Sequence, residues 1–267
     1  METKHKSAFI EVVEKACHKK WDLLQDSWAK YAVRSLFGGI FLTMSTAAGA
    51  FAADKINTLH PSLGKFVFAF IFAFGLAYIL FLNAELATSN MMYLSAGTYL
   101  KKIDWKRALT ILLVCSFFNL VGALAIGWLF GHSGAFSHMD ANSFITTTVE
   151  SKLARTGGQI FLEGILANTF VNVAILSYAL VKDQAAKLTL VISAIFMFVF
   201  LGNEHVVANF ASFSISIFSP YHAQGMEFFN VLRQWFFAYI GNCVGGGVII
   251  GLAYAWLNTT KSSYVEL

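Results

Sequence analysis

Six apolar segments, separated by short polar stretches, constrain the fold of this chain more than any other feature. Four of them are long enough to cross a lipid bilayer as uninterrupted helices, which takes about 20 residues: 35–53, 108–130, 159–181 and 235–257. Hydrophobic residues make up 57% of the sequence and charged residues only 13%, whereas a soluble domain carries about a quarter charged residues. The sequence therefore predicts an all-α integral membrane protein surrounded by a lipid bilayer.

The other two apolar segments, the second and the fifth, are each interrupted by a polar run. Each consists of an apolar arm, a polar run and a shorter apolar arm: 66–82, 83–90 and 91–100 in one, and 188–201, 202–209 and 210–218 in the other. The shorter arms cannot cross a bilayer alone. We therefore expect six transmembrane helices, of which the second and fifth are broken.

The two breaks belong to an internal repeat. Three features correspond: Glu85 with Glu204, Asn90 with Asn209, and an Asn-x-Val-Gly run starting at Asn119 with one starting at Asn242. Three spans in each half require the halves to have opposite orientations in the membrane. Discontinuous helices at equivalent positions of inverted repeats are typical of transport proteins with a site near mid-membrane.

Basic residues indicate the orientation of the spans. Fourteen of the 19 Lys and Arg residues precede the first span or follow the second, fourth and sixth. Because basic residues concentrate on the cytoplasmic side, we expect both termini in the cytoplasm and the protein in the cell membrane. Residues 1–34 are predicted to form a cytoplasmic segment with an amphipathic helix at the membrane face, 35–258 the six-helix membrane domain, and 259–267 a cytoplasmic tail.

Four ionisable residues lie within or beside the spans: Glu85, Glu163, Glu204 and His205. Such residues are costly in a membrane and mark functional sites by default. We favour a functional role for the Glu204-His205 break. For Glu85 and Glu163, a structural role in accepting hydrogen bonds is an equal alternative.

Each break has a chemical consequence. It leaves backbone groups that hydrocarbon cannot satisfy, and nearby short polar side chains can bond them: Asn83, Thr88, Ser89, Asn90, Asn203 and Asn209. The N-terminal end of each half-helix also carries partial positive charge, which attracts anions. His205 can exchange a proton near neutral pH, although a water-poor site favours the neutral ring unless an anion stabilises the cation. His205 could thus bond a weak-acid anion or protonate it.

Short motifs across all six spans resemble those of the formate/nitrite transporter family. They are Glu-Leu-Ala-Thr-Ser at 85–89, Glu-His with Ala-Asn at 204–209, Gly-Ile-Leu-Ala-Asn at 164–168, Asn-Leu-Val-Gly-Ala at 119–123 and a glycine-rich run at 241–247. Lys152 precedes Asn168 by sixteen residues, as the family's outer-vestibule lysine does. The resemblance implies a channel for small monovalent weak-acid anions, with formate or nitrite as the substrate.

The resemblance also implies roles for individual residues. Thr88 would contact the anion opposite His205, and Asn168 would bond the histidine ring or the substrate. Lys152 would draw anions into the outer vestibule and could pair with Glu204. Apolar constrictions would be formed by Phe72, Leu76, Leu86 and Phe198. For the phenylalanines and Leu76, ordinary packing is an equal alternative.

For the whole protein, the family implies a homopentamer of aquaporin-like protomers with one pore in each subunit, and a role for the amphipathic N-terminal helix in gating. This chain departs from the family pattern at four positions: Ala87, Asn172, Asn203 and Val206. These departures surround the predicted pore residues, so they bear on pore width and on the choice of anion.

The alternatives to an anion channel are an anion/proton symporter, a water or neutral-solute channel, and an enzyme. An obligate anion/proton symporter would use the same histidine. A water or neutral-solute channel is disfavoured because neither break contains an Asn-Pro-Ala element, and the prolines Pro61 and Pro220 lie outside both breaks. An enzyme is disfavoured because no nucleophile–base arrangement or phosphate-binding loop is evident. We expect no cofactor, no metal and no nucleic-acid partner.

Overall fold

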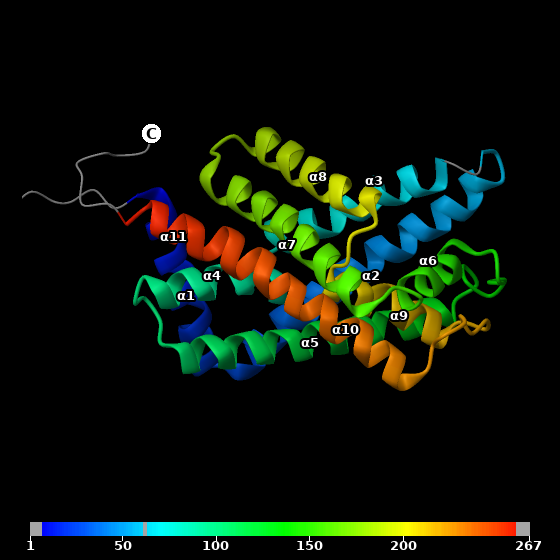
Figure 1. The fold of residues 1–267 in the computed structure, drawn as a ribbon, viewed down its shortest axis with the longest axis horizontal. Helices are drawn as coiled ribbons and strands as arrows, with labels where there is room; N and C mark the ends of the chain where they lie inside the picture. The colour runs from blue at the N-terminus through cyan, green and yellow to red at the C-terminus, as the bar shows by residue number, and fades with distance from the viewer. Residues whose placement is uncertain (1–6, 61–62, 260–267) are drawn as a thin grey trace, which may run out of the picture.

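The computed structural model describes residues 7–60 and 63–259, and within them the chain forms helices joined by short connections (Figure 1). The elements, in chain order, are α1 (Ala8–Asp26), α2 (Trp28–Asn57), α3 (Leu63–Phe81), α4 (Ala87–Tyr99), α5 (Trp105–Gly131), α6 (Phe144–Leu153), α7 (Gly157–Leu180), α8 (Gln184–Leu201), α9 (Val206–Phe218), α10 (Phe228–Asn242), the π-helix η1 (Cys243–Leu252) and α11 (Ala253–Leu257). The predicted tail lies outside the described residues except for Thr259, and so do Lys4, Lys6 and Lys261.

Six helices in the described part of the chain are long and apolar enough to cross a membrane. They are α2, α3, α5, α7, α8 and the continuous rod formed by α10, η1 and α11. The shorter helices α4 and α9 follow α3 and α8 after a few non-helical residues. The predicted all-α fold with six spans, of which the second (α3–α4) and fifth (α8–α9) are broken, is therefore confirmed.

A left-handed residue ends the first arm of each broken helix. Asn83 has φ 57° and Gly202 has φ 84°, a conformation that L-residues adopt at a cost and that Gly and Asn tolerate best. The chain then becomes extended at Leu86 and at His205, which are the N-caps of α4 and α9. The two breaks are thus built in the same way.

Close contacts between spans repeat in the two halves. A side chain added at Gly122 of α5 would overlap the backbone of Leu36 in α2, and one added at Gly245 of η1 would overlap the backbone of Ile165 in α7. Small residues allow membrane helices to approach to this distance. The Asn-x-Val-Gly runs identified in the sequence therefore serve as equivalent packing sites in the α2–α5 and α7–η1 pairs.

Helix α1 packs across one end of the molecule, beside α4 and α11, while α6 lies at the opposite end (Figure 1). The buried face of α1 carries Phe9, Val13, Cys17 and Lys20, which recur at the spacing of one helix face. The two ends of the described chain thus lie at the same end of the molecule, as an even number of spans requires. Helix α6, which the sequence analysis did not anticipate, belongs to the connection between the third and fourth spans.

Candidate functional site

His205 is buried at the N-terminus of α9, with 2% of its surface exposed. Its ring Nδ1 accepts a hydrogen bond from the backbone N–H of Ala208 at 3.1 Å, and Nε2 lies 2.8 Å from Oγ1 of Thr88. A nitrogen that accepts a hydrogen bond carries no proton, so the proton of the neutral ring sits on Nε2. The ring therefore donates to Thr88 while it caps its own helix.

A small apolar chamber surrounds the ring. It is lined by Leu42, Phe72, Leu76, Leu86, Val171, Ile195, Phe198 and His205. Its volume is about 10 Å³, roughly the space of a single water molecule. The predicted constriction residues Phe72, Leu76, Leu86 and Phe198 are therefore brought together against His205, in a space too small for a hydrated ion.

Leu86 and His205 occupy equivalent places in the two repeats. Each is an N-cap, and each lines the chamber. The N-terminal ends of α4 and α9 therefore both face this space. Because helix N-termini carry partial positive charge, the chamber favours negative charge even though its wall is apolar.

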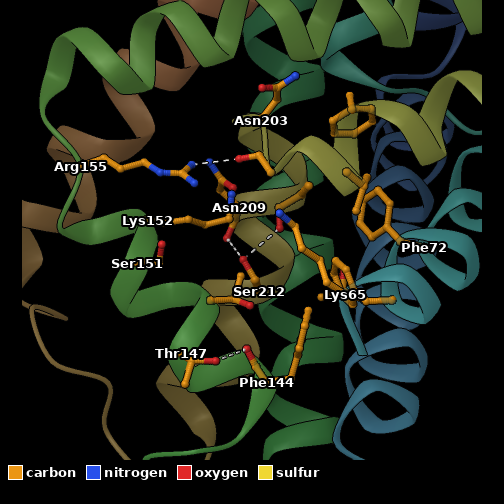
Figure 2. Close-up of a pocket in the computed structure, with 17 residues that line it drawn as sticks. Lys65, Phe72, Phe144, Thr147, Ser151, Lys152, Arg155, Asn203, Asn209 and Ser212 are labelled. Atoms are coloured by element: carbon orange, nitrogen blue, oxygen red, sulfur yellow. Dashed lines mark hydrogen bonds between the residues drawn. The ribbon is translucent and has the colours of Figure 1, made fainter. Parts of the chain in front are cut away.

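A larger cavity of about 260 Å³ lies on the α6 side of the chamber, and we call it the outer cavity. Phe72 and Phe198 line both spaces, with their ring centroids 6.3 Å apart, so these two rings separate the outer cavity from the chamber. Figure 2 shows Lys152 and Arg155 on one side of the outer cavity, and Lys65 and Phe72 on the other.

The carboxylate of Glu204 is fully buried and accepts hydrogen bonds from four side chains. Lys152 Nζ, Asn209 Nδ2 and Gln234 Nε2 each lie 2.8 Å from its Oε2, and the guanidinium of Arg155 bonds Oε1. A buried carboxylate held by two cations and two amides is fully compensated, and removal of one partner would leave charge unpaired. The structure thus places Lys152 against Glu204, as the family resemblance implied.

Arg155 was not singled out from the sequence. Its Nη1 also contacts Glu163 Oε2 at 2.6 Å and the carbonyl of Gly202 at 3.0 Å. The available signal was a second basic residue in the same connection as Lys152. Glu163 therefore belongs to the network around Glu204, through Arg155.

The other break carries a matching ion pair on the α1 side. Lys20 Nζ lies 2.5 Å from Glu85 Oε2, and Asn90 Nδ2 approaches the same oxygen at 3.4 Å. Asn90 and Asn209 thus occupy equivalent positions beside Glu85 and Glu204. Lys20 was counted from the sequence only as a topology signal, because its approach to Glu85 depends on how α1 docks.

Asn119 and Asn242 stabilise the two breaks from neighbouring spans. Asn119 donates to the carbonyls of Ser35 and Glu85, and it accepts from the N–H of Ala87. Asn242 makes the same three types of contact: it donates to the carbonyls of Gly164 and Glu204, and accepts from the N–H of Val206. These two amides, rather than only the polar residues of the breaks themselves, satisfy the freed backbone.

Asn168 lies beside the site, and its side-chain amide hydrogen-bonds backbone carbonyls. Its Nδ2 donates to the carbonyls of Thr88 and Asn242, at 3.2 and 2.8 Å, and its Oδ1 accepts from Asn172 at 2.9 Å. The resemblance implied a bond from Asn168 to the ring of His205 or to the substrate; the structure shows its amide bound to the backbone of Thr88, the residue that the ring contacts. Asn172, one of the departures from the family pattern, bonds the same carbonyl at 3.3 Å.

Within residues 7–60 and 63–259, no group of three or more His, Cys, Asp or Glu side chains could hold a metal ion. The cysteines Cys17, Cys115 and Cys243 are free thiols. The polar groups of the site are instead hydrogen-bond donors and cations that surround buried carboxylates.

Comparison with known proteins identifies a family and two similar folds. Residues 7–256 match the family model described as formate/nitrite transporter. The chain is 28% identical to the formate channel BtFdhC of Bacillus thuringiensis over 223 residues, which cover 83% of this chain and 84% of that one. Its fold is similar to an FNT family ion channel (TM-score 0.87, 23% identity, 94% and 98% coverage) and to a pentameric formate channel with formate bound (TM-score 0.72, 22% identity, 91% and 98% coverage).

Proposed function

Because this chain belongs to the formate/nitrite transporter family, we propose that it conducts small monovalent weak-acid anions, formate or nitrite first among them, through a pore centred on His205. The family consists of transporters, so the chain is a multi-pass membrane transport protein and not an enzyme. The observation that carries the proposal is the buried contact of Thr88 with His205, which lines a small apolar chamber onto which two helix N-termini open.

The outer cavity is the proposed entrance. Lys152 and Arg155 line it but pair with Glu204, while Lys65 lines it without a carboxylate partner among the described residues. Positive charge in a narrow cleft raises the local concentration of anions. An anion that moves inward must pass Phe72 and Phe198. Since the chamber has a volume of only about 10 Å³, these rings must turn aside and the anion must shed its water.

His205 and Thr88 then replace part of the lost hydration. The Nε2–H of His205 can turn from Thr88 Oγ1 to an oxygen of the anion, and the hydroxyl hydrogen of Thr88 is available as a second donor. Hydrogen bonds to a charged group are roughly twice as strong as neutral ones. In this scheme the ring acts as a donor and stays neutral.

Proton transfer from His205 is the alternative and corresponds to a proton-linked carrier. It would require a cationic ring, whose Nδ1–H would face the N–H of Ala208 across 3.1 Å. Two donors facing one another cannot hydrogen-bond, so protonation would remove the hydrogen bond by which His205 caps α9. The geometry therefore favours a passive channel over a carrier.

We further propose a homopentamer in the cell membrane with both termini in the cytoplasm. The pentameric state of the similar formate channel supports the assembly. The distribution of basic residues supports the orientation, which places α1 inside and the outer cavity outside.

The proposed function is tested by reconstituting the protein in liposomes and measuring the flux of formate, nitrite, hydrosulfide, lactate and acetate at several pH values. Formate or nitrite should cross at least tenfold faster than in protein-free liposomes, and osmotic water flow should rise much less. If water or glycerol crossed rapidly while every anion was retained, the anion channel would be rejected in favour of a neutral-solute channel.

A further inference from the structure

Of the three cations that line the outer cavity, one has no carboxylate partner among the described residues. Lys152 and Arg155 pair with Glu204, and Arg155 pairs with Glu163 as well. Lys65 of α3 also lines the cavity. Among the described residues its ammonium forms no ion pair or hydrogen bond, and its recorded contact is with the ring of Phe200, 5.8 Å from the centroid.

Arg155 is held rigidly but keeps part of its guanidinium free. Nη1 makes all of its contacts, to Glu163, Glu204 and the carbonyl of Gly202. Within the part of the chain that the structure describes, Nη2 has no hydrogen-bond partner. Because the guanidinium is planar, fixing Nη1 also fixes where the two N–H bonds of Nη2 point.

Gly202 leaves an open niche between these two cations. The point where a Cβ would sit on Gly202 lies 3.6 Å from Arg155 Nη2 and 3.6 Å from Lys65 Nζ, and no other atom outside the neighbouring residues comes within 4 Å. Gly202 lines the outer cavity. The cavity wall therefore contains a space about one atom wide, bordered by two positively charged nitrogens that face it from α3 and from the α6–α7 connection.

We propose that Lys65 and Arg155 form an anion-binding site beside Gly202, which takes one oxygen of a small monovalent oxyanion before it passes the Phe72–Phe198 constriction. The inference rests on the proposed function, because its ligand is the transported anion. It adds an entry site made of residues that the family motifs do not include, separate from Lys152 and from the Thr88–His205 pair.

Such a site has a defined effect on transport. Two charged donors would replace water on one side of the anion while the other side remains hydrated in the cavity. The anion would therefore lose its hydration in two stages, at Gly202 and then at His205. Removal of the entry site should weaken capture from the outer side and leave the slower passage through the chamber almost unchanged.

The test measures initial formate uptake against formate concentration in liposomes of known protein orientation, with the native protein and three variants. Lys65→Gln removes the unpaired charge. Gly202→Ala fills the niche without changing charge, at the cost of a Cβ in the left-handed backbone that ends α8. Lys55→Gln is the matched control, since Lys55 is an exposed lysine of α2 that also stacks on a phenylalanine, Phe51, and does not line the outer cavity.

We expect Lys65→Gln and Gly202→Ala each to raise the half-saturating formate concentration about three- to tenfold for entry from the outer face. Maximal flux should change less than about twofold, and Lys55→Gln should behave as the native protein. The effect of Gly202→Ala should persist in about 0.5 M impermeant salt, which screens long-range attraction. Lys65→Gln removes only the contact with Phe200 and is expected to fold normally. It therefore still tests the site if Gly202→Ala folds poorly.

Two results would overturn the site. One is a Lys65→Gln protein with the same half-saturation as Lys55→Gln. The other is a folded Gly202→Ala protein with the half-saturating formate concentration of the native protein, together with a Lys65→Gln protein whose half-saturating concentration returns to the native value in high salt. That pair of results would mean that Lys65 attracts the anion only over a distance. An absence of formate flux through the native protein would instead reject the proposed function itself, and the site with it.

Discussion

Asn119 and Asn242 make the same contacts in the two halves of the molecule, and these contacts explain how a membrane helix can break. A break leaves a carbonyl before it and an N–H after it without helical partners, and hydrocarbon offers no replacement. An Asn side chain has both a donor and an acceptor, so one amide satisfies both sides. It bridges Glu85 to Ala87 in one half, and Glu204 to Val206 in the other.

Replacing Asn242 by Leu, which has the same number of side-chain heavy atoms and the same branching, should destabilise the protein strongly. The substitution leaves the carbonyl of Glu204 and the N–H of Val206 without partners, at about 1–3 kcal/mol each, and it removes an additional bond to the helical carbonyl of Gly164. The total of about 2–6 kcal/mol should lower the apparent melting temperature in detergent by about 4–24 °C. Asn142→Leu, at an exposed position in the connection between α5 and α6, should change it by less than about 2 °C. Equal melting temperatures for both variants would contradict the bridging role.

The residues of the site differed in how far the sequence could identify them. His205 and Glu204 stood out because an ionisable residue inside an apolar segment is costly. Asn119 and Asn242 were visible as a repeat, but their partners lie 32 to 84 residues away in the sequence, so their task depended on the fold. Arg155 looked like an ordinary basic residue of a connection until the structure placed it against Glu204.

At the scale of the elements, each break is completed by a lysine from outside the broken helix. Helix α6 carries Lys152, which pairs with Glu204, and it is followed by the connection that contains Arg155. Helix α1 carries Lys20, which pairs with Glu85. Both broken helices were predictable from their polar runs. The docking of α1 and the existence of α6 could not be predicted in this way. An amphipathic pattern shows that a helix has a buried face, but it does not identify the residues that pack against that face.

Cys17 reports whether α1 stays docked. Its thiol is buried and donates to the carbonyl of Tyr93 at 3.4 Å, and burial raises the pKa of the thiol to about 11. The reactive thiolate is therefore scarce near pH 7.5, and maleimide labelling should be slow. Lys20→Met, which removes the ion pair to Glu85, should speed the labelling of Cys17 at least fivefold.

Cys115, buried within α5, is the internal control for that experiment. Its labelling, followed by peptide mass spectrometry in the same sample, should stay slow in Lys20→Met. A parallel rise at both cysteines would indicate general loosening of the protein. Unchanged labelling of Cys17 would show that the Lys20–Glu85 pair does not hold α1 in place.

At the scale of the whole molecule, two similar halves produce an asymmetric chamber. The repeat places Leu86 opposite His205 at the chamber, so that one half contributes an apolar side chain and the other a hydrogen-bond donor. Two helix N-termini supply positive potential from both halves. The overall fold followed from the pattern of apolar segments, whereas the volume of the chamber and its closure by Phe72 and Phe198 required side-chain packing.

Formate flux through His205→Leu and His205→Asn tests the account most directly. Leucine removes the donor that faces Thr88 and the acceptor that caps α9, whereas asparagine keeps a donor and is a favourable helix cap. Because a hydrogen bond to a charged group contributes about 1.5–3 kcal/mol, His205→Leu should conduct formate at least about tenfold more slowly than the native protein. His205→Asn should conduct at an intermediate rate. Native flux through a folded His205→Leu protein would contradict a pore centred on His205.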